Sequence, residues 1–437
     1  MTHPSFNLAR SADILQVRGR QILDSRGRPT VEVDVELRDG SYGRACAPSG
    51  ASTGRHEVLE LRDGDDGLHE GRGVSKAVNN INGEIAELLK GRPATSQTGL
   101  DEALRTHDGT ADLSRLGANA VIATSLAICR AAAMHERLPL HRYIAQLVGT
   151  TRTSMPMPMT NILSGGAHAR RSMDFQDFLA VPVGAKNYAD ALNMLTRVRS
   201  AASELLAEDG ITTLLADEGG LSPGYSSAEE AFQLMMRAFE RAKLRPGHDV
   251  AIAIDVAASE FYREGKYHLA GEQRTLDGEE MAEYLGDFIR RYPLISIEDA
   301  FEQDDWTSWV AFTKRFPNVQ IVGDDLFVTN PERIARGIEV GAANATLIKV
   351  NQNGTLSGAF EAMKCARAGG YATIVSARSG ETEDSFIADL AVGSNAGQIK
   401  IGSVRNSERL GKYNQLTRIA EQDDVELTFP FLWSDVR

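Results

Sequence analysis

Apolar runs that each end in a charged residue recur through the second half of the chain. "VAIAI" is followed by Asp255, "LISI" by Glu298 and "QIVG" by Asp324. Further on, "ATLI" is followed by Lys349 and "GQI" by Lys400. Short unbroken apolar runs are typical of strands buried on both faces, and roughly 25 residues are enough for a strand, a helix and two loops. The pattern predicts parallel strands joined by helical crossovers, which is the architecture of a (β/α) barrel.

The first 150 residues carry different patterns. Between Val31 and Leu37, apolar residues alternate with Glu and Asp, which predicts a strand with one buried face. Asp39-Gly40 is typical of a hairpin turn, and the stretch from about 75 to 148 has a helical pattern that ends in a buried, Ala-rich helix pair. We therefore predict an α/β fold, with an N-terminal α+β capping domain over 1–150 and a modified (β/α)8 TIM-like barrel over 151–437.

Composition and charge limit the classes of function. The 437 residues suit a barrel of about 250 residues plus a second domain, and the net charge of −13 argues against a nucleic-acid surface. No stretch approaches the roughly 20 apolar residues of a membrane span. The leader, residues 1–14, lacks the apolar core of a signal peptide, and the aromatic tail "FPFLWSDVR" is of a kind that more often docks than floats free. Cys46, Cys129 and Cys365 are few and scattered, as in reduced cytosolic proteins, so we expect a cytoplasmic location.

Three carboxylates at strand ends indicate a metal site. In a (β/α) barrel, the residues at the C-terminal ends of the strands meet at one mouth, where such barrels do their chemistry. Asp255, Glu298 and Asp324 would supply hard oxygen ligands, with no Cys or His beside them, and such ligands favour Mg²⁺ over Zn²⁺. Each carboxylate alone could instead cap a helix, but the three together with two lysines predict a divalent cation beside a general base.

Lys349 is the candidate base. A lysine that is partly desolvated and close to a metal ion loses part of its preference for the ammonium form, which makes its amine a better base. The alternative is a structural salt bridge to Asp324 or Glu298. Glu218, on the Gly-rich loop "DEGG", is a candidate acid toward a leaving hydroxide, with an exposed turn as its alternative reading.

An anion-binding pair completes the candidate chemistry. Arg378 with Ser379 places a guanidinium and a hydroxyl side by side, which suits bidentate phosphate binding. A metal held by carboxylates, a lysine base and an acid on the other side would together eliminate water from an anionic hydroxy-acid.

Long motifs in a fixed order then identify a family. The segments "DSRGRPTVEV", "APSGASTG", "DEGG", "SIED", "VGDDLFVTN", "LIKVNQ", "RSGETED" and "KYNQL" resemble enolase (phosphopyruvate hydratase), and the resemblance extends over nearly the whole chain. It implies an α+β cap on a modified (β/α) barrel, two Mg²⁺ ions per active site and a small phosphorylated hydroxy-acid as substrate. It also implies a homodimer or a larger even-numbered oligomer.

The resemblance assigns a role to each matching position. The first Mg²⁺ would be bound by Asp255, Glu298 and Asp324, and Ser52 would help to bind the second as its loop closes. Lys349 would remove the proton, and Glu218 would assist the departure of the hydroxide. Arg378 and Ser379 would bind the phosphate, Lys400 would bind the carboxylate, and His168 would lie on a flexible "GG-x-HA" loop.

The chain also departs from the family's usual residues. Ala377 stands where enolases have an active-site histidine, Asp177 where they have a catalytic glutamate, and Ser164 where asparagine is usual. Arg170 and Arg171 lie in the lid loop, where the family is usually neutral or acidic. Asp177 shortens a carboxylate by on the order of 1 Å, and such a shift can lower a rate a hundredfold.

Three hypotheses follow from this combination. The first is a working enolase that interconverts 2-phosphoglycerate and phosphoenolpyruvate. The second is a paralogue of phosphinothricin-type phosphonate biosynthesis, which forms carboxyphosphonoenolpyruvate from a bulkier phosphonylated hydroxy-acid; Arg170 and Arg171 would then bind the extra carboxylate. The third is a binding protein that keeps the fold and has lost catalysis.

Overall fold

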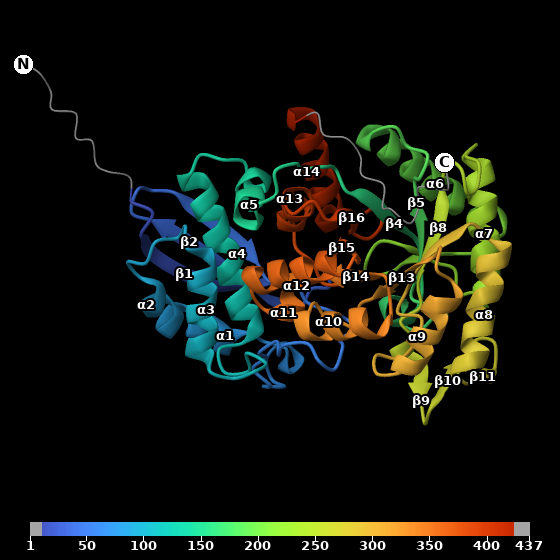
Figure 1. Cartoon of the computed structure of the whole chain (residues 1–437), viewed down its shortest axis with the longest axis horizontal. Helices are drawn as coiled ribbons and strands as arrows, with labels where there is room; N and C mark the ends of the chain where they lie inside the picture. Colours follow the sequence, from blue (N-terminus) through green and yellow to red (C-terminus); the bar gives the residue numbers. More distant parts are fainter. Residues whose placement is uncertain (1–10, 424–437) are drawn as a thin grey trace, which may run out of the picture.

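The computed structural model describes residues 11–423, which form a smaller N-terminal part and a larger barrel (Figure 1). Residues 1–10 of the predicted leader and the whole aromatic tail lie outside the described residues. The N-terminal part, blue to cyan in Figure 1, lies on one side of the molecule, and the barrel makes up the rest.

The N-terminal part is an antiparallel sheet covered by helices. Its strands follow the order β1 (Ile14–Leu23), β2 (Pro29–Leu37) and β3 (Tyr42–Cys46). The predicted alternation in β2 is confirmed, because Val31, Val33, Val35 and Leu37 are all fully buried. The long helix α4 (Ala118–His135) packs so closely on β3 that a side chain at Gly43 would collide with the carbonyl oxygen of Ala127.

The helices of this part were predicted as a helical stretch from about 75 to 148 that ends in a helix pair. The structure divides it into α1 (Ser75–Asn80), a π-helical turn (Ile81–Ile85), α2 (Ala86–Leu89), α3 (Gln97–Asp108), α4 and α5 (Leu140–Val148).

The predicted barrel is confirmed. Eight strands form a closed sheet because the last strand pairs with the first. The strands are β4 (Met157–Ser164), β5 (Asp177–Val181), β8 (Ala251–Asp255), β12 (Leu294–Glu298), β13 (Gln320–Gly323), β14 (Ala345–Ile348), β15 (Ala372–Ser376) and β16 (Gly397–Lys400). The helices that follow them are α6 (Tyr188–Glu208), α7 (Ala228–Arg241), α8 (Gly278–Arg291), α9 (Trp306–Arg315), α10 (Pro331–Val340), α11 (Val350–Asn353), α12 (Leu356–Ala368), α13 (Phe386–Gly393) and α14 (Ser407–Asp423).

One strand departs from a regular parallel barrel. β5 runs antiparallel to both β4 and β8. The reason is its connection to β4, because residues 165–176 contain only a short 3-10 turn (Gly166–Ala169) and no crossover helix. As a result Asp177, the first residue of β5, pairs with Ser164 at the end of β4 and with Asp255 at the end of β8.

Two small antiparallel additions were not predicted. A hairpin of β6 (Leu214–Leu215) and β7 (Leu221–Ser222) extends the barrel sheet beside β4 and carries the "DEGG" loop. A separate sheet follows β8 and consists of β9 (Tyr262–Arg263), β10 (Lys266–Leu269) and β11 (Arg274–Leu276). No helix within residues 11–423 is long and apolar enough to cross a bilayer.

The N-terminal part is fixed to the barrel at the strand ends. Ser49 forms a bridge with Gly380, in the loop after β15. On the other side, the buried carboxylate of Asp101 in α3 accepts hydrogen bonds from the backbone and the hydroxyl of Ser357, at 2.9 and 2.7 Å. The Ser49 bridge adjoins the loop that contains Ser52, and this loop lines the cavity at the mouth of the barrel.

Candidate active site

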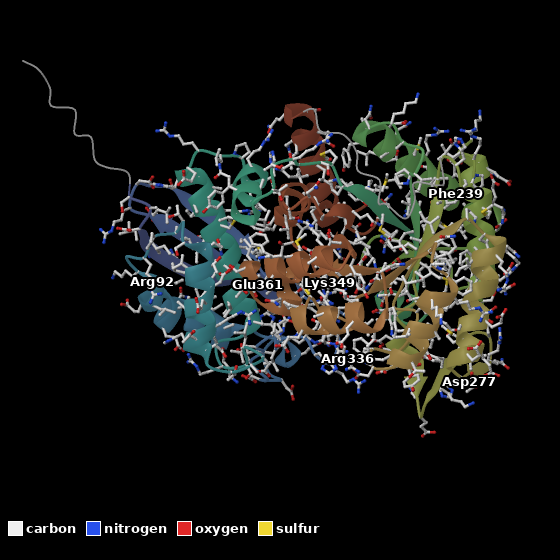
Figure 2. The ribbon with its side chains drawn as sticks, in the orientation of Figure 1. Arg92, Phe239, Asp277, Arg336, Lys349 and Glu361 are labelled. Carbon is white, nitrogen blue, oxygen red and sulfur yellow. The ribbon has the colours of Figure 1, made fainter. Side chains whose placement is uncertain are left out.

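The strand ends bring the predicted charged residues together at the barrel mouth. The ammonium of Lys400 lies 2.7 Å from Asp255 Oδ2 and 2.6 Å from Glu298 Oε2. Lys349, near the middle of the molecule in Figure 2, forms an ion pair with Asp324. All five side chains are buried, and each lies at the last residue of a barrel strand or directly after it. The mouth therefore holds two lysines among three carboxylates, as the sequence predicts.

A small cavity opens beside these ion pairs. Its lining includes the predicted residues Ser52, His168, Glu218, Asp255, Lys349, Arg378, Ser379 and Lys400, together with Ala377. Three further predicted residues contact this lining: Glu298 pairs with Lys400, Asp324 pairs with Lys349, and Asp177 pairs with His168.

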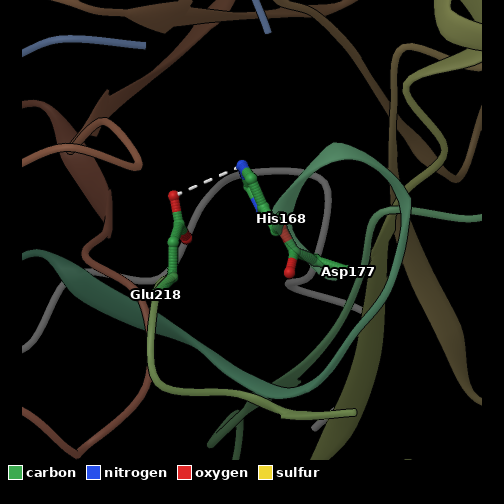
Figure 3. Close-up of side chains that lie close together, drawn as sticks. All are labelled: His168, Asp177 and Glu218. Atoms are coloured by element: carbon green, nitrogen blue, oxygen red, sulfur yellow. Dashed lines mark hydrogen bonds and ion pairs between the residues drawn. The ribbon is translucent and has the colours of Figure 1, made fainter. Parts of the chain in front are cut away.

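His168 lies between two carboxylates (Figure 3). Its Nδ1 is 3.1 Å from Asp177 Oδ2, and its Nε2 is 3.7 Å from Glu218 Oε1. Burial lowers the pKa of His168, but Glu218 and Asp177 outweigh that effect and raise it to about 9. His168 is therefore an imidazolium at neutral pH.

The two carboxylates beside His168 are tuned in opposite directions. Burial raises the pKa of Glu218, but the cations around it, above all His168, bring that pKa below its usual value. Burial raises the pKa of Asp177 above its usual value in spite of His168. Asn161 Nδ2 also donates to Glu218 Oε2 at 3.0 Å. Paired groups whose pKa values are pushed apart are typical of acid–base sites.

Lys349 differs from the predicted neutral amine. Burial lowers its pKa, as expected, but Asp324 outweighs burial, so the pKa of Lys349 lies above its usual value. The salt bridge that the sequence left open as an alternative is thus present. The expectation rested on a nearby metal ion. A cation bound to Asp324 would compete for the carboxylate that now holds the ammonium form.

The carboxylates at the mouth fit a hard divalent cation. Glu298 Oε1 is buried and has no hydrogen-bond partner among residues 11–423. Burial, and then Asp255, raise the pKa of Glu298 well above its usual value. Beside them, just after the ends of β12 and β13, ligand atoms of Asp299, Asp324 and Asp325 lie within 4.8 Å of one another. This surplus of oxygen donors matches Mg²⁺ chemistry.

Arg378 is held mainly by Glu57 and Asn351, neither of which was predicted. Its guanidinium pairs with Glu57, at 3.0 Å from Oε2 and 3.2 Å from Oε1, and also donates to Asn351 Oδ1 and to the backbone oxygen of Ser52. The hydroxyl of Ser379 accepts from Arg26 at 3.2 Å. The motif "APSGASTG" was recognised, but nothing in its spacing indicates that Glu57, further along the chain, turns back to Arg378.

Two glutamines complete the polar contacts and were also missed. Gln176 Nε2 donates to Asp255 Oδ2 at 3.0 Å, and Gln352 Nε2 donates to Asp324 Oδ1 at 2.8 Å. Each therefore fixes one oxygen of a predicted metal ligand, in the way that outer partners orient ligands in metal sites. An amide in a sequence carries no signal of such a role, because its partner is known only from the fold.

Arg170 and Arg171 are not brought to this cavity. Both side chains are exposed, and Arg171 lies 3.3 Å from Glu260. Arg171 lines a separate, larger cavity between the 165–176 loop and the β9–β10 hairpin. Neither arginine lines the catalytic cavity, and their contact with a substrate carboxylate stays a prediction.

Comparison with known families agrees with this geometry. Residues 14–144 match the family model described as "Enolase, N-terminal domain", and residues 152–429 match "Enolase, C-terminal TIM barrel domain". The two matches together cover most of the chain and agree with the family that the motifs predict. The chain therefore belongs to the enolase family.

Proposed function

We propose that this chain is a Mg²⁺-dependent lyase that eliminates water from 2-phosphoglycerate, or from a close analogue, to give an enol phosphate. Family membership supports a lyase. One observation carries the finer proposal: a lysine and an acid–base pair line the same small cavity as two anion-binding cations. These are Lys349, Glu218 with His168, Arg378 and Lys400.

The cations of the cavity would orient the substrate. Arg378 and Ser379 bind the phosphate, and Lys400 binds the carboxylate, so that the carbon between them faces Lys349. When bound by Asp255, Glu298, Asp324 and Ser52, Mg²⁺ supplies positive charge that stabilises the additional negative charge on the substrate carboxylate.

Two proton transfers then complete the elimination. Lys349 Nζ takes the proton from the carbon beside the carboxylate, the new double bond forms, and the carbon–oxygen bond to the leaving hydroxyl breaks. The hydroxide takes a proton from the His168–Glu218 pair and leaves as water. His168 holds that proton in the resting state, because Glu218 is ionised beside it.

A second candidate substrate is favoured by one feature of the cavity. Ala377 presents only a methyl group to the cavity, and Asp177 lies behind His168, where the hydroxyl of Ser164 holds its carboxylate at 2.6 Å. Short side chains at these positions suit a bulkier ester, such as the precursor of carboxyphosphonoenolpyruvate. The arginines proposed to bind its extra carboxylate lie elsewhere in this conformation, so this candidate ranks second.

The decisive experiment is turnover of 2-phosphoglycerate at saturating Mg²⁺, measured for the wild type and for an Ala377→His plus Asp177→Glu double variant. A wild-type kcat in the usual range of about 1–10³ s⁻¹ supports the first proposal. A trace rate that the double variant raises by orders of magnitude points to the bulkier substrate. If neither protein turns over 2-phosphoglycerate, the bulkier ester is assayed in the same way, and no turnover of that substrate either would leave a binding protein without catalysis. The cytoplasmic location and the even-numbered homo-oligomer stay predictions.

A further inference from the structure

Glu57 lies where the Ser52 loop, the phosphate-binding arginine and the base's carboxylate partner meet. It does not line the catalytic cavity, and its side chain is only 9% exposed. Its carboxylate nevertheless contacts three different segments of the chain. These contacts are with the backbone N–H of Gly54, the guanidinium of Arg378 and the amide of Gln352.

The hydrogen bonds of Arg378 leave little freedom to its guanidinium. Nη1 donates to Glu57 Oε2 at 3.0 Å and to Asn351 Oδ1 at 3.1 Å. Nη2 donates to Glu57 Oε1 at 3.2 Å and to the carbonyl of Ser52 at 3.0 Å. A guanidinium has five N–H groups, and these four bonds restrain both terminal nitrogens, so a bound phosphate would share or replace one of these acceptors. Glu57 supplies half of those bonds and is the anionic partner in this set.

The Ser52 loop is packed directly against this ion pair. A Cβ at Gly50 would lie 2.0 Å from Arg378 Nη2, so the backbone reaches the guanidinium only because residue 50 has no side chain. Gly54 N–H donates to Glu57 Oε1 at 3.0 Å and ties the far end of the loop to the same carboxylate. The Ser52 loop and the guanidinium of Arg378 are therefore both bonded to the carboxylate of Glu57.

The same carboxylate is linked to the proton-abstracting side of the cavity. Gln352 Nε2 lies 3.3 Å from Glu57 Oε1 and 2.8 Å from Asp324 Oδ1, and Asp324 is the ion-pair partner of Lys349. The oxygen of Gln352 accepts from the hydroxyl of Thr329 at 2.7 Å, which fixes the orientation of the amide. The buried side chain of Gln352 thus joins Glu57, the partner of Arg378, to Asp324, the partner of Lys349.

We infer that Glu57 is a positioning residue that acts through Arg378: it holds the guanidinium toward the cavity and fixes the Ser52 loop against it. The inference rests on the proposed function, because it takes Arg378 to be the phosphate ligand. Loss of Glu57 should therefore change the affinity for phosphate in the direction opposite to a simple charge effect. Removing a negative charge beside an anion site normally strengthens binding of the anion, whereas removing a positioning partner weakens it.

The test compares inorganic phosphate binding and steady-state kinetics in Glu57→Gln, Glu57→Asp and a matched control. Glu60→Gln is the control, because Glu60 lies on the same segment but its carboxylate bonds Arg62 and the hydroxyl of Ser49 and makes no ion pair with Arg378. Phosphate binding is measured by titration calorimetry without Mg²⁺, so that this readout does not depend on a metal or on turnover. Circular dichroism and thermal unfolding check that each variant folds.

We expect Glu57→Gln to weaken phosphate binding by about tenfold or more, as loss of a bidentate charge-assisted contact does, and to raise KM more than it lowers kcat. Glu57→Asp keeps the charge but shortens the reach, so it should fall between the wild type and Glu57→Gln. Glu60→Gln should bind phosphate as the wild type does. Should Glu57→Gln fail to fold, Glu57→Asp carries the same comparison.

Unchanged or tighter phosphate binding in folded Glu57→Gln overturns the positioning role, because it leaves Glu57 acting through charge alone. An Arg378→Lys variant separates this failure from failure of the proposed function. If Arg378→Lys leaves phosphate affinity unchanged, the phosphate does not bind at Arg378, and the inference falls together with that assignment.

Discussion

Ser164 and Asp177 face each other across β4 and β5, and the Ser164 hydroxyl donates a 2.6 Å hydrogen bond to Asp177 Oδ1. Both side chains are fully buried. A Ser164→Ala substitution would leave this carboxylate oxygen without its donor, because His168 lies on the other oxygen. We expect the free energy of unfolding to fall by about 1–3 kcal/mol, measured by urea denaturation.

The matched control for that prediction is Ser200→Ala, an exposed position on α6. The control should change the unfolding free energy by less than about 0.5 kcal/mol. Equal effects of the two substitutions would mean that the Ser164 hydrogen bond contributes nothing of its own.

Folding raises the pKa of His168 from 6.5 to about 9, and this gives stability a defined pH dependence. The folded protein holds the proton more tightly than the unfolded chain does. The stabilisation is therefore complete below pH 6.5 and is lost as the pH rises through 9. We expect His168→Gln to destabilise the protein most at about pH 6 and progressively less up to about pH 9.5.

The measurement is urea unfolding of the wild type and His168→Gln at several pH values across this window. The exposed His248, replaced by Gln, provides the control for a general effect of pH on histidine variants. A difference between the wild type and His168→Gln that stays constant from pH 6 to 9.5 would contradict the prediction.

Mg²⁺ should stabilise the fold, because the carboxylates at the mouth outnumber the lysines among them. A ligand that binds only the folded state at a concentration of 100 times its Kd contributes about 2.7 kcal/mol. We expect the thermal midpoint to rise with added Mg²⁺ and to return to its starting value with EDTA. Glu298→Gln should reduce this rise, because it removes a carboxylate whose second oxygen has no partner among residues 11–423.

Potassium chloride at equal ionic strength separates specific binding from charge screening. If it raises the midpoint as much as Mg²⁺ does, or if Glu298→Gln keeps the full response to Mg²⁺, the predicted metal site is wrong.

Lys349→Met should lower kcat by about 10²–10⁴-fold, the contribution typical of a general base. Lys364→Met is the matched control, because Lys364 is exposed on α12 and should leave kcat unchanged. Circular dichroism must show that the Lys349 variant folds, since Asp324 loses its ion-pair partner. Retention of most of the wild-type kcat would assign proton removal to another group.

Much of the barrel and of its charged mouth could be predicted from the sequence. An apolar run that ends in a charge is a local pattern, and a closed parallel sheet brings such ends to one place whatever the loops do. Asp255, Glu298, Lys349 and Lys400 meet for this reason.

The rest depends on contacts between segments that are distant in the sequence. Glu57 meets Arg378 across a separation of 321 residues, and no local pattern specifies that pairing. The orientation of Arg171 depends on how a loop folds, and the pKa of Lys349 depends on which neighbour lies closer. The reversal of β5 was not predicted, because an apolar run carries no information about the direction of its strand.

The reversal of β5 makes the loop over the cavity the turn of a long hairpin, with both of its ends at the mouth. In a regular barrel, a loop above the site leads into a helix that carries the chain to the opposite end. Here residues 165–176 leave β4 at Ser164 and return at Asp177, two residues that are bonded to each other. The N–H of Gly165 also donates to the carbonyl of Gln176 at 2.8 Å, so the base of this loop is closed by hydrogen bonds on both sides of His168. Sequence changes at 164 and 177 would therefore alter the base that carries His168 as well as the space beneath the loop.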